Sequence, residues 1–157
     1  TGSESVRQEM PLYLPDRGEA GTHNVTGIAG LLEGVRFVRR TGQSRILAHE
    51  RRLLARIEQS LADVNDVQLF TAEGENQAGV LSFVCDGWDC QDLARALGQR
   101  GIAVRAGLHC APLAHSHAGT LDSGTVRVSF SAFNREEEVE YFQAVLKQIV
   151  HGILRGY

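Results

Sequence analysis

Apolar positions along the chain follow two periods, one of about 3.6 residues and one of two residues. The longer period predicts helices over residues 24–41, 44–63, 89–100 and from 134 towards the end of the chain. The shorter period, together with short apolar runs, predicts strands over residues 67–71, 79–85, 102–107 and 125–130. The passage between the last two strands reads as a short helix or a loop.

The ends of the first and last predicted helices carry capping residues. Asn24 or Thr26 is placed to cap the first helix, and Gly42 follows its end. Asn134 is expected to cap the last helix, with Glu137 three residues further on completing a pair that resembles a capping box. We therefore expect the first helix to begin and end near these residues, and the last helix to begin near Asn134.

This order of elements predicts an α+β fold, in which a small and mostly antiparallel sheet is packed with helices. Residues 1–23 are rich in Gly, Ser, Glu and Pro and show no periodicity, so we expect an extended segment before a domain formed by residues 24–157. The chain does not begin with Met, and its first residues lack the basic and apolar regions of a signal peptide. We expect it to be a piece of a longer protein.

Composition narrows the environment and the partners. The net charge of the 157 residues is −3, which predicts neither a nucleic-acid surface nor an anionic-membrane surface. No stretch approaches the roughly 20 apolar residues of a membrane span. The three cysteines are odd in number and irregularly spaced, which indicates a reducing cytoplasm. Lys147 is the only lysine and is predicted on the outer side of the last helix, so a cofactor bound as a Schiff base would need a lysine from elsewhere.

Cys110 is the strongest candidate for chemistry. It stands in RAGLHCAPLAH, after a predicted strand and at the start of a helical turn, where backbone dipoles favour the thiolate. Arg105 and His109 add a cation and a polarisable ring nearby. Cys85 and Cys90 fit the alternative interpretation, that a cysteine is a small core residue. We therefore interpret Cys110 as a nucleophile.

Arg127 is the second candidate. In the strand TVRVSF, alternation points Val126 and Val128 one way and Arg127 the other way, towards the polar face. The planar guanidinium group can bind a carboxylate through two parallel hydrogen bonds. The alternative is an exposed arginine in a surface ion pair. Sequence periodicity leaves both interpretations open.

Two weaker signals concern a metal and a phosphate. His109, Cys110, His115 and His117 have the side chains that zinc prefers, but adjacent ligands at 109 and 110 suit a tetrahedral site poorly. No CxxC pair supports such a site, so solvated loop histidines are the favoured interpretation and no metal is expected. The glycines of TGSES and EAGTHNVTGIAG could let backbone amides approach a phosphate, with Thr22 supplying a hydroxyl group, or could simply form turns.

Taken together, the motifs resemble the C-terminal third of the cysteine desulfurases and of related class V aminotransferase-like enzymes, which depend on pyridoxal 5'-phosphate. Three stretches carry the resemblance, namely EAGTHNVTGIAGL at 19–31, GIAVRAGLHCAPL at 101–113 and GTVRVSFSAFNREEEV at 124–139. The resemblance implies the small C-terminal domain of a fold-type I enzyme, with residues 1–23 as the segment that connects it to a large domain.

The resemblance also implies roles for particular residues. Cys110 matches the cysteine that attacks the sulfur of a cofactor-bound L-cysteine and becomes a persulfide, which leaves alanine. Arg127 matches the arginine that holds the substrate carboxylate. Arg105 and His109 match the pattern around the cysteine and are expected to support it. A sulfur-acceptor protein and a place in iron–sulfur cluster assembly follow from the same resemblance.

For the cofactor, the resemblance implies that Thr22 reaches the phosphate of the partner subunit's cofactor in a homodimer, and that Gly2 and Ser3 lie close to the same phosphate. The family's Schiff-base lysine belongs to the large domain, so this chain alone is expected to be inactive and to hold no cofactor covalently. Selenocysteine lyase, or another class V lyase, remains an alternative. An alternative of another class is a non-catalytic binding or assembly module.

Overall fold

The structure is a computed structural model and describes residues 9, 11–19, 21–62, 64–72 and 74–152. The chain divides into two compact units, Thr1–Gln43 and Ser44–Tyr157. The division expected from the sequence, a connecting segment at 1–23 and a small domain at 24–157, concerns the longer protein and stays a prediction.

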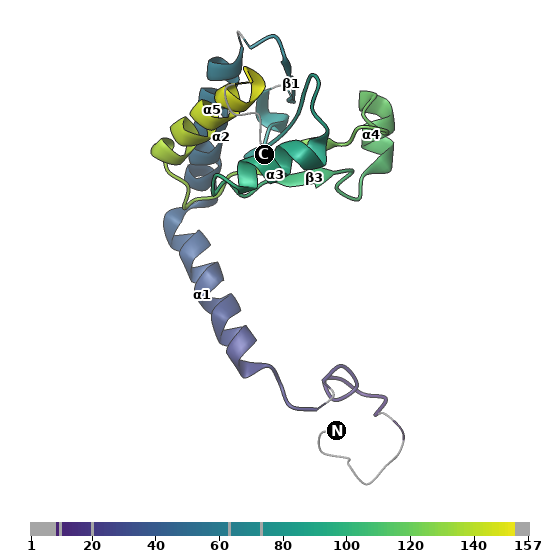
Figure 1. The fold of residues 1–157 in the computed structure, drawn as a ribbon. Helices are drawn as coiled ribbons and strands as arrows, with labels where there is room; N and C mark the ends of the chain where they lie inside the picture. Colours follow the sequence, from purple (N-terminus) through teal and green to yellow (C-terminus); the bar gives the residue numbers. More distant parts are fainter. Residues whose placement is uncertain (1–8, 10, 20, 63, 73, 153–157) are drawn as a thin grey trace. The chain divides into compact units, whose positions relative to one another are not determined.

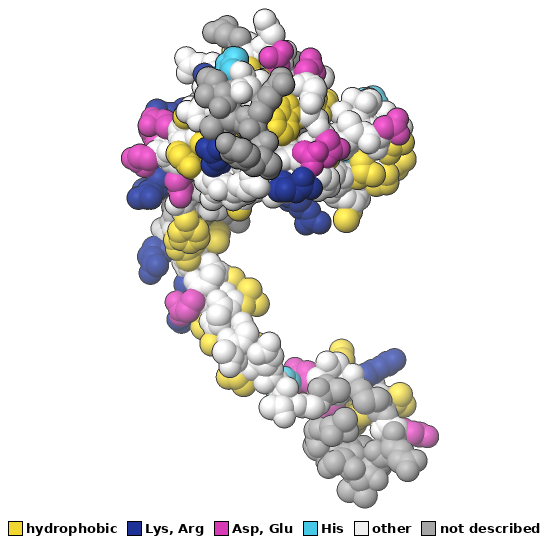
Figure 2. All heavy atoms as spheres, in the orientation of Figure 1, with side chains coloured by type: hydrophobic (Ala, Val, Ile, Leu, Met, Phe, Trp, Pro, Cys, Tyr) yellow, Lys and Arg dark blue, Asp and Glu magenta, His cyan; other side chains and the backbone are white. Residues whose placement is uncertain are grey.

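The first unit contains one long helix, α1 (Val25–Thr41), which begins and ends where the sequence predicts. The side chain of Asn24 accepts a hydrogen bond from the backbone nitrogen of Gly27 at 2.9 Å, and Gly42 ends the helix with a φ of 91° that favours glycine. No residue of α1 is buried. Its apolar side chains follow the helix along one stretch of the surface (Figure 2) and include Val25, Ile28, Leu31, Leu32 and Val35.

The second unit is built on a four-stranded antiparallel sheet, which confirms the predicted α+β fold (Figure 1). Its strands lie in the order β1-β2-β4-β3. Their bounds are β1 Val67–Phe70, β2 Val80–Cys85, β3 Arg105–Gly107 and β4 Thr125–Ser129. A 3-10 turn, η2 (Gly74–Asn76), lies between β1 and β2.

The strand predicted at 102–107 is shorter than expected, because pairing with β4 begins only at Arg105. The backbone nitrogen of Ile102 donates to the carbonyl of Leu97 at 3.1 Å, at the end of the preceding helix. Gly101 turns the chain with a φ of 74°. Ile102 is therefore still bound to the helix end, and the chain reaches β4 a few residues later.

Three helices cover one face of the sheet, here called the inner face: α2 (Gln43–Leu61), α3 (Cys90–Gly98) and α5 (Glu136–Val150). Leu81, Phe83 and Val126 are fully buried on this face. The rings of Phe83 and Phe142 meet edge to face, with centroids 6.1 Å apart. One apolar core thus joins the sheet to all three helices. None of the helices in the described residues is long and apolar enough to cross a membrane.

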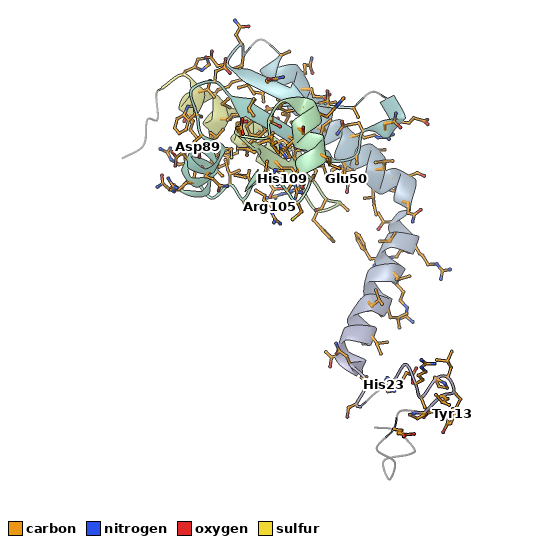
Figure 3. The ribbon with its side chains drawn as sticks, turned by 90° about the vertical axis from the view of Figure 1, so that its right-hand side faces the viewer. Tyr13, His23, Glu50, Asp89, Arg105 and His109 are labelled. Atoms are coloured by element: carbon orange, nitrogen blue, oxygen red, sulfur yellow. The ribbon has the colours of Figure 1, made fainter. Side chains whose placement is uncertain are left out.

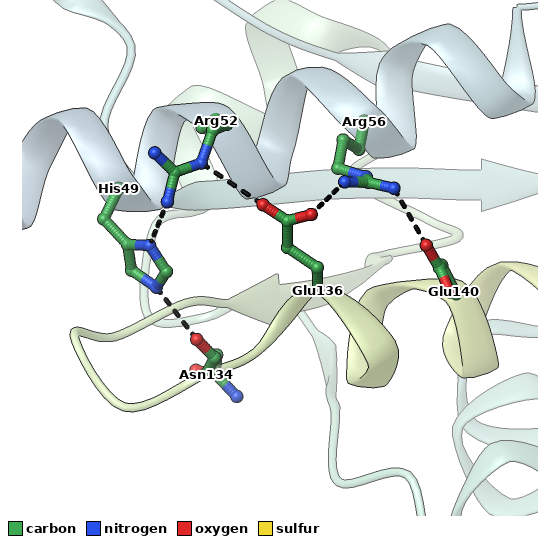
Figure 4. A network of polar contacts seen from close by, with 6 residues as sticks. All are labelled: His49, Arg52, Arg56, Asn134, Glu136 and Glu140. Carbon is green, nitrogen blue, oxygen red and sulfur yellow. Dashed lines mark hydrogen bonds and ion pairs between the residues drawn. The ribbon is translucent and has the colours of Figure 1, made fainter.

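Polar contacts also tie α2 to the start of α5 (Figure 4). Arg56 donates to the carboxylates of both Glu136 and Glu140. His49 Nε2 lies 2.8 Å from the backbone carbonyl oxygen of Asn134. These side chains are half exposed, and exposed ion pairs typically add at most about 1 kcal/mol, so the network orients two helices that the core already holds.

The cap of α5 lies one residue later than predicted. Arg135 is the capping position, and its backbone nitrogen donates to the side chain of Glu138 at 2.8 Å. This hydrogen bond, with a second from the side chain of Asn134, lowers the pKa of Glu138. Asn134 instead accepts from the backbone nitrogen of Ser131 at 2.9 Å and closes the turn before the helix.

The opposite face of the sheet, here called the outer face, carries a different set of side chains. Residues directly opposite one another in an antiparallel sheet point to the same side. The register aligns Phe70, Ser82, Arg127 and Arg105 across all four strands on this face. A short helix, α4 (Pro112–Ala118), lies against part of the outer face, where its residues share a cavity with Phe70 and Ser82.

Candidate active site

The passage between β3 and α4 presents Cys110. The backbone nitrogen of Ala111 donates to the carbonyl of Leu108 at 2.8 Å, which closes a tight turn around the cysteine. His109 and Cys110 both adopt left-handed backbone, with φ of 50° and 59°. Two successive residues other than glycine in this region are strained, and such backbone persists only where its surroundings hold it. Strain of this kind favours a functional role for the turn.

The three thiols differ in environment. Cys110 is exposed, whereas Cys85 and Cys90 are buried. Burial raises the pKa of Cys85 to about 12, with the nearby charge of Asp86 adding to the effect. Burial also raises the pKa of Cys90, followed by the charge of Asp89. The two core cysteines are therefore held in the unreactive thiol form, as their sequence context predicts.

Arg127 lies on the outer face, where alternation predicts it. Its guanidinium Nε is buried and has no hydrogen-bond partner. Arg105 lies directly opposite on β3, and neither arginine forms an ion pair with any residue that the structure describes. A buried guanidinium nitrogen without a partner is costly in a folded protein. This arrangement favours an anionic ligand over the alternative of a structural ion pair.

His109 connects the cysteine turn to the sheet. Its Nε2 lies 3.3 Å from the hydroxyl oxygen of Thr125 on β4, and its Nδ1 is buried without a partner. Arg105 and His109 arise from the same passage of the chain (Figure 3). Burial lowers the pKa of His109, and the charge of Arg127 lowers it further. His109 is therefore expected to stay neutral at physiological pH, so the local positive charge comes from the arginines.

The environment of His115 differs from the sequence-based expectation. The prediction of a solvated loop histidine is wrong for this residue, because His115 lies on α4 and is only 6% exposed. Its Nδ1 shares a hydrogen bond of 2.8 Å with the hydroxyl group of Thr120. His117, two residues further on, is exposed, as was expected. Within the described ranges, no group of three or more His, Cys, Asp or Glu side chains is arranged to hold a metal ion.

The cofactor residues implied by the resemblance are placed only in part. Thr22 is exposed, two residues before the cap of α1, while Gly2 and Ser3 lie outside the described residues. Lys147 lies on α5, which packs against the inner face, whereas Arg127 points from the outer face. The sole lysine is thus on the wrong side of the sheet to bind a cofactor near Cys110. Pyridoxal phosphate does not fit the residues of this chain as a covalently held group.

Known proteins resemble this chain over nearly its full length. The family described as Aminotransferase class-V matches residues 5–142. A probable cysteine desulfurase of Mycolicibacterium paratuberculosis is 41% identical over 149 residues, which make up 94% of this chain and 21% of that protein. A probable cysteine desulfurase of Xylella fastidiosa is 38% identical over 136 residues, 86% of this chain and 32% of that protein.

Solved structures also resemble this chain. The apo cysteine desulfurase of Thermococcus onnurineus NA1 superimposes with a TM-score of 0.80 at 38% identity, over 88% of this chain and 34% of that one. An alanine–glyoxylate aminotransferase from Nostoc sp., at 21% identity and a TM-score of 0.62 over 85% of this chain and 33% of that one, shares the fold alone.

The fold and the sequence matches define an α+β domain of the aminotransferase type. The chain belongs to the class-V aminotransferase family. It spans about a fifth to a third of the length of the relatives named above.

Proposed function

We propose that this chain is the sulfur-accepting part of a cysteine desulfurase. Cys110 is the group that receives sulfur, and Arg127 binds the carboxylate of L-cysteine. The observation that carries the proposal is the buried, unpartnered Nε of Arg127 on the face that also holds the turn of the exposed thiol. His109 lies between Cys110 and the strand of Arg127. It follows β3 and directly precedes Cys110, and its ring contacts Thr125 on β4.

The proposed reaction balances with these residues. The Cys110 sulfur attacks the sulfur of the substrate, an S–S bond forms, and the C–S bond of the substrate breaks. The electron pair of that bond remains on carbon, which takes up a proton, so the products are alanine and a persulfide on Cys110. Pyridoxal phosphate supplies the electron sink for C–S cleavage when it is bound to the longer protein.

The residues of the chain divide the work. Arg127 orients the substrate through two charge-assisted hydrogen bonds. Arg105 adds positive charge on the same face, and neutral His109 supports the turn without repelling the arginines. The exposure of Cys110 suits a thiol that must meet both the substrate and a sulfur-acceptor protein.

The longer protein supplies what this chain lacks. We propose that residues 1–23 connect the small domain, 24–157, to a large domain that carries the cofactor lysine. Thr22, which is exposed, is proposed to contact the phosphate of the partner subunit's cofactor in a homodimer, together with Gly2 and Ser3. Three free cysteines fit a reducing cytoplasm, where the persulfide would feed iron–sulfur cluster assembly.

The test uses the full-length protein. Purified enzyme is incubated with pyridoxal phosphate and L-cysteine, alanine is measured, and the extra sulfur atom is located by peptide mass spectrometry. We expect the sulfur on Cys110, and we expect Cys110→Ser to abolish both its capture and alanine release while Cys90→Ala retains them. Turnover of selenocysteine alone would favour the lyase alternative, and unchanged activity of Cys110→Ser would refute the proposal.

A further inference from the structure

The three buried polar side chains among the described residues, His115, Thr120 and Thr125, gather at one place. Together with Phe70 and Ser82 from the outer face, they line a cavity of about 150 Å³ beneath α4. The core on the inner face, by contrast, is apolar. Because a buried polar group costs free energy unless it is hydrogen-bonded, a polar cluster in this position calls for a specific role.

His115 ties down the end of α4. Its side chain is bonded to that of Thr120, and the backbone nitrogen of Thr120 donates to the carbonyl of His115 at 2.9 Å. Gly119, with a φ of 72°, turns the chain between them. The helix has only seven residues and its capping residue, Ala111, makes no side-chain bond. A helix this short is marginal by itself, so its position depends on these contacts.

The same contacts extend to Cys110. The backbone nitrogen of His115 donates to the carbonyl of Ala111 at 3.2 Å, directly after the cysteine. On the other side of Cys110, the ring of His109 contacts Thr125 and lies with its centroid 5.9 Å from that of His115. The strained left-handed turn at residues 109 and 110 is therefore held from both ends.

We propose that His115 is a positioning residue that, through Thr120, holds α4 and thereby keeps the backbone of Cys110 in place to receive sulfur. The proposal rests on the proposed function of Cys110. His115 acts through the turn and does not touch the substrate. Without its bond to Thr120, α4 shifts and the strained turn relaxes, so fewer enzyme molecules hold the Cys110 sulfur in reach. Arg127 is unaffected, because its own strand, β4, is paired with β2 on one side and with β3 on the other.

The experiment compares variants of the full-length enzyme. His115→Leu keeps the bulk of the ring and removes its nitrogens, and Thr120→Val removes only the hydroxyl group. We expect each to lower kcat for alanine release about ten- to a hundredfold, the range that a misplaced catalytic group can cause. KM for L-cysteine should change by less than about twofold, since the carboxylate site is intact. The double variant should lose no more than the worse single variant, because both break one bond.

Two further variants separate positioning from general damage. His115→Asn can place an amide near the position of Nδ1 and should recover most of kcat, which a merely space-filling role would not predict. His117→Leu alters an exposed residue on the same helix and should leave kcat unchanged. If His115→Leu fails to fold, Thr120→Val and His115→Asn supply the same comparison, each checked by its melting temperature.

The outcomes distinguish the two proposals. If sulfur reaches Cys110 in the wild type but Thr120→Val and a folded His115→Leu keep full kcat, the positioning role is overturned. It is also overturned if the loss appears wholly in KM, or if His117→Leu loses as much activity. If no sulfur reaches Cys110 in the wild type, the proposed function itself fails.

Discussion

The inner and outer faces of the sheet differ in how their side chains are buried and paired. On the inner face, Leu81, Phe83 and Val126 are fully buried in the apolar core that joins the sheet to the helices. On the outer face, Arg127 has a buried nitrogen without a partner, and His109 has another. Well-satisfied packing stabilises the fold, whereas unsatisfied polar groups and strained backbone weaken it. The difference indicates that packing on the inner face stabilises the domain, whereas the outer face leaves buried polar groups without protein partners.

The largest expected effect is the difference in reactivity between the exposed and the buried thiols. Alkylation of the protein with a limiting amount of reagent near neutral pH should label Cys110 much faster than Cys85, because burial raises the pKa of Cys85 to about 12 and removes its side chain from solvent, whereas Cys110 is exposed. Labelled peptides are quantified by mass spectrometry. Preferential labelling of Cys85 or Cys90 would contradict the interpretation of Cys110 as the reactive thiol and would identify it as a structural residue.

Substitutions at two neighbouring residues of β2 compare how much each face of the sheet contributes to the free energy of unfolding. Phe83→Ala should lower the free energy of unfolding by about 3–5 kcal/mol, because it leaves a cavity in the inner core. Ser82→Ala, one residue away on the outer face, should change it by less than about 0.5 kcal/mol. Denaturant titration measures both. Equal costs for the two substitutions would mean that the outer face also carries the fold.

Substitution of Arg127 tests whether the outer face contributes to enzymatic activity. In the full-length enzyme, Arg127→Ala should lower kcat/KM for L-cysteine by roughly ten- to a hundredfold or more, since a charge-assisted bond contributes about 1.5–3 kcal/mol. The fold and the cofactor absorbance should stay nearly intact. Arg127→Lys should rescue poorly, because lysine lacks the planar fork. A variant that unfolds as alanine and works fully as lysine would instead identify a structural ion pair.

His109 predicts a smaller effect, seen in the pH dependence of stability. Its pKa in the folded state is lowered from 6.5, so the unfolded chain binds more protons as the pH falls below about 6.5. Stability contributed by neutral His109 is therefore present above this pH and is lost as the pH falls towards the lowered value. His109→Gln should flatten the stability curve over that interval, measured by melting at several pH values. An unchanged slope would show that the ring is not desolvated.

The smallest effect is expected at Lys147. Because α5 packs against the inner face, Lys147→Ala in the full-length enzyme should leave the visible absorbance of bound pyridoxal phosphate unchanged. Spectra of the wild type and the variant, recorded after excess cofactor is removed, make the comparison. Loss of the cofactor band in the variant would contradict the assignment of this lysine to the structural side of the domain.

Periodicity in the sequence determined much of this molecule. It predicted helices α2, α3 and α5, the existence of the four strands, the burial of Cys85 and Cys90, and the side of β4 from which Arg127 points, while it left α4 open as a helix or a loop. These features depend on neighbours along the chain, namely the alternation of a strand and the apolar stripe of a helix. Residue chemistry indicated Cys110 as a nucleophile and Arg127 as a carboxylate-binding candidate, whereas the resemblance implied the persulfide on Cys110 and the phosphate contact of Thr22; all of these roles stay predictions.

Tertiary structure decided the rest. The short β3, the cap at Arg135, the burial of His115 and the register that sets Arg105 opposite Arg127 were not predictable from local spacing. Each depends on a partner distant in the sequence or on the competition of several backbone groups for one bond. His115 and His117 show the reason, since both stand in the same short polar run and only packing against the sheet buries one and exposes the other.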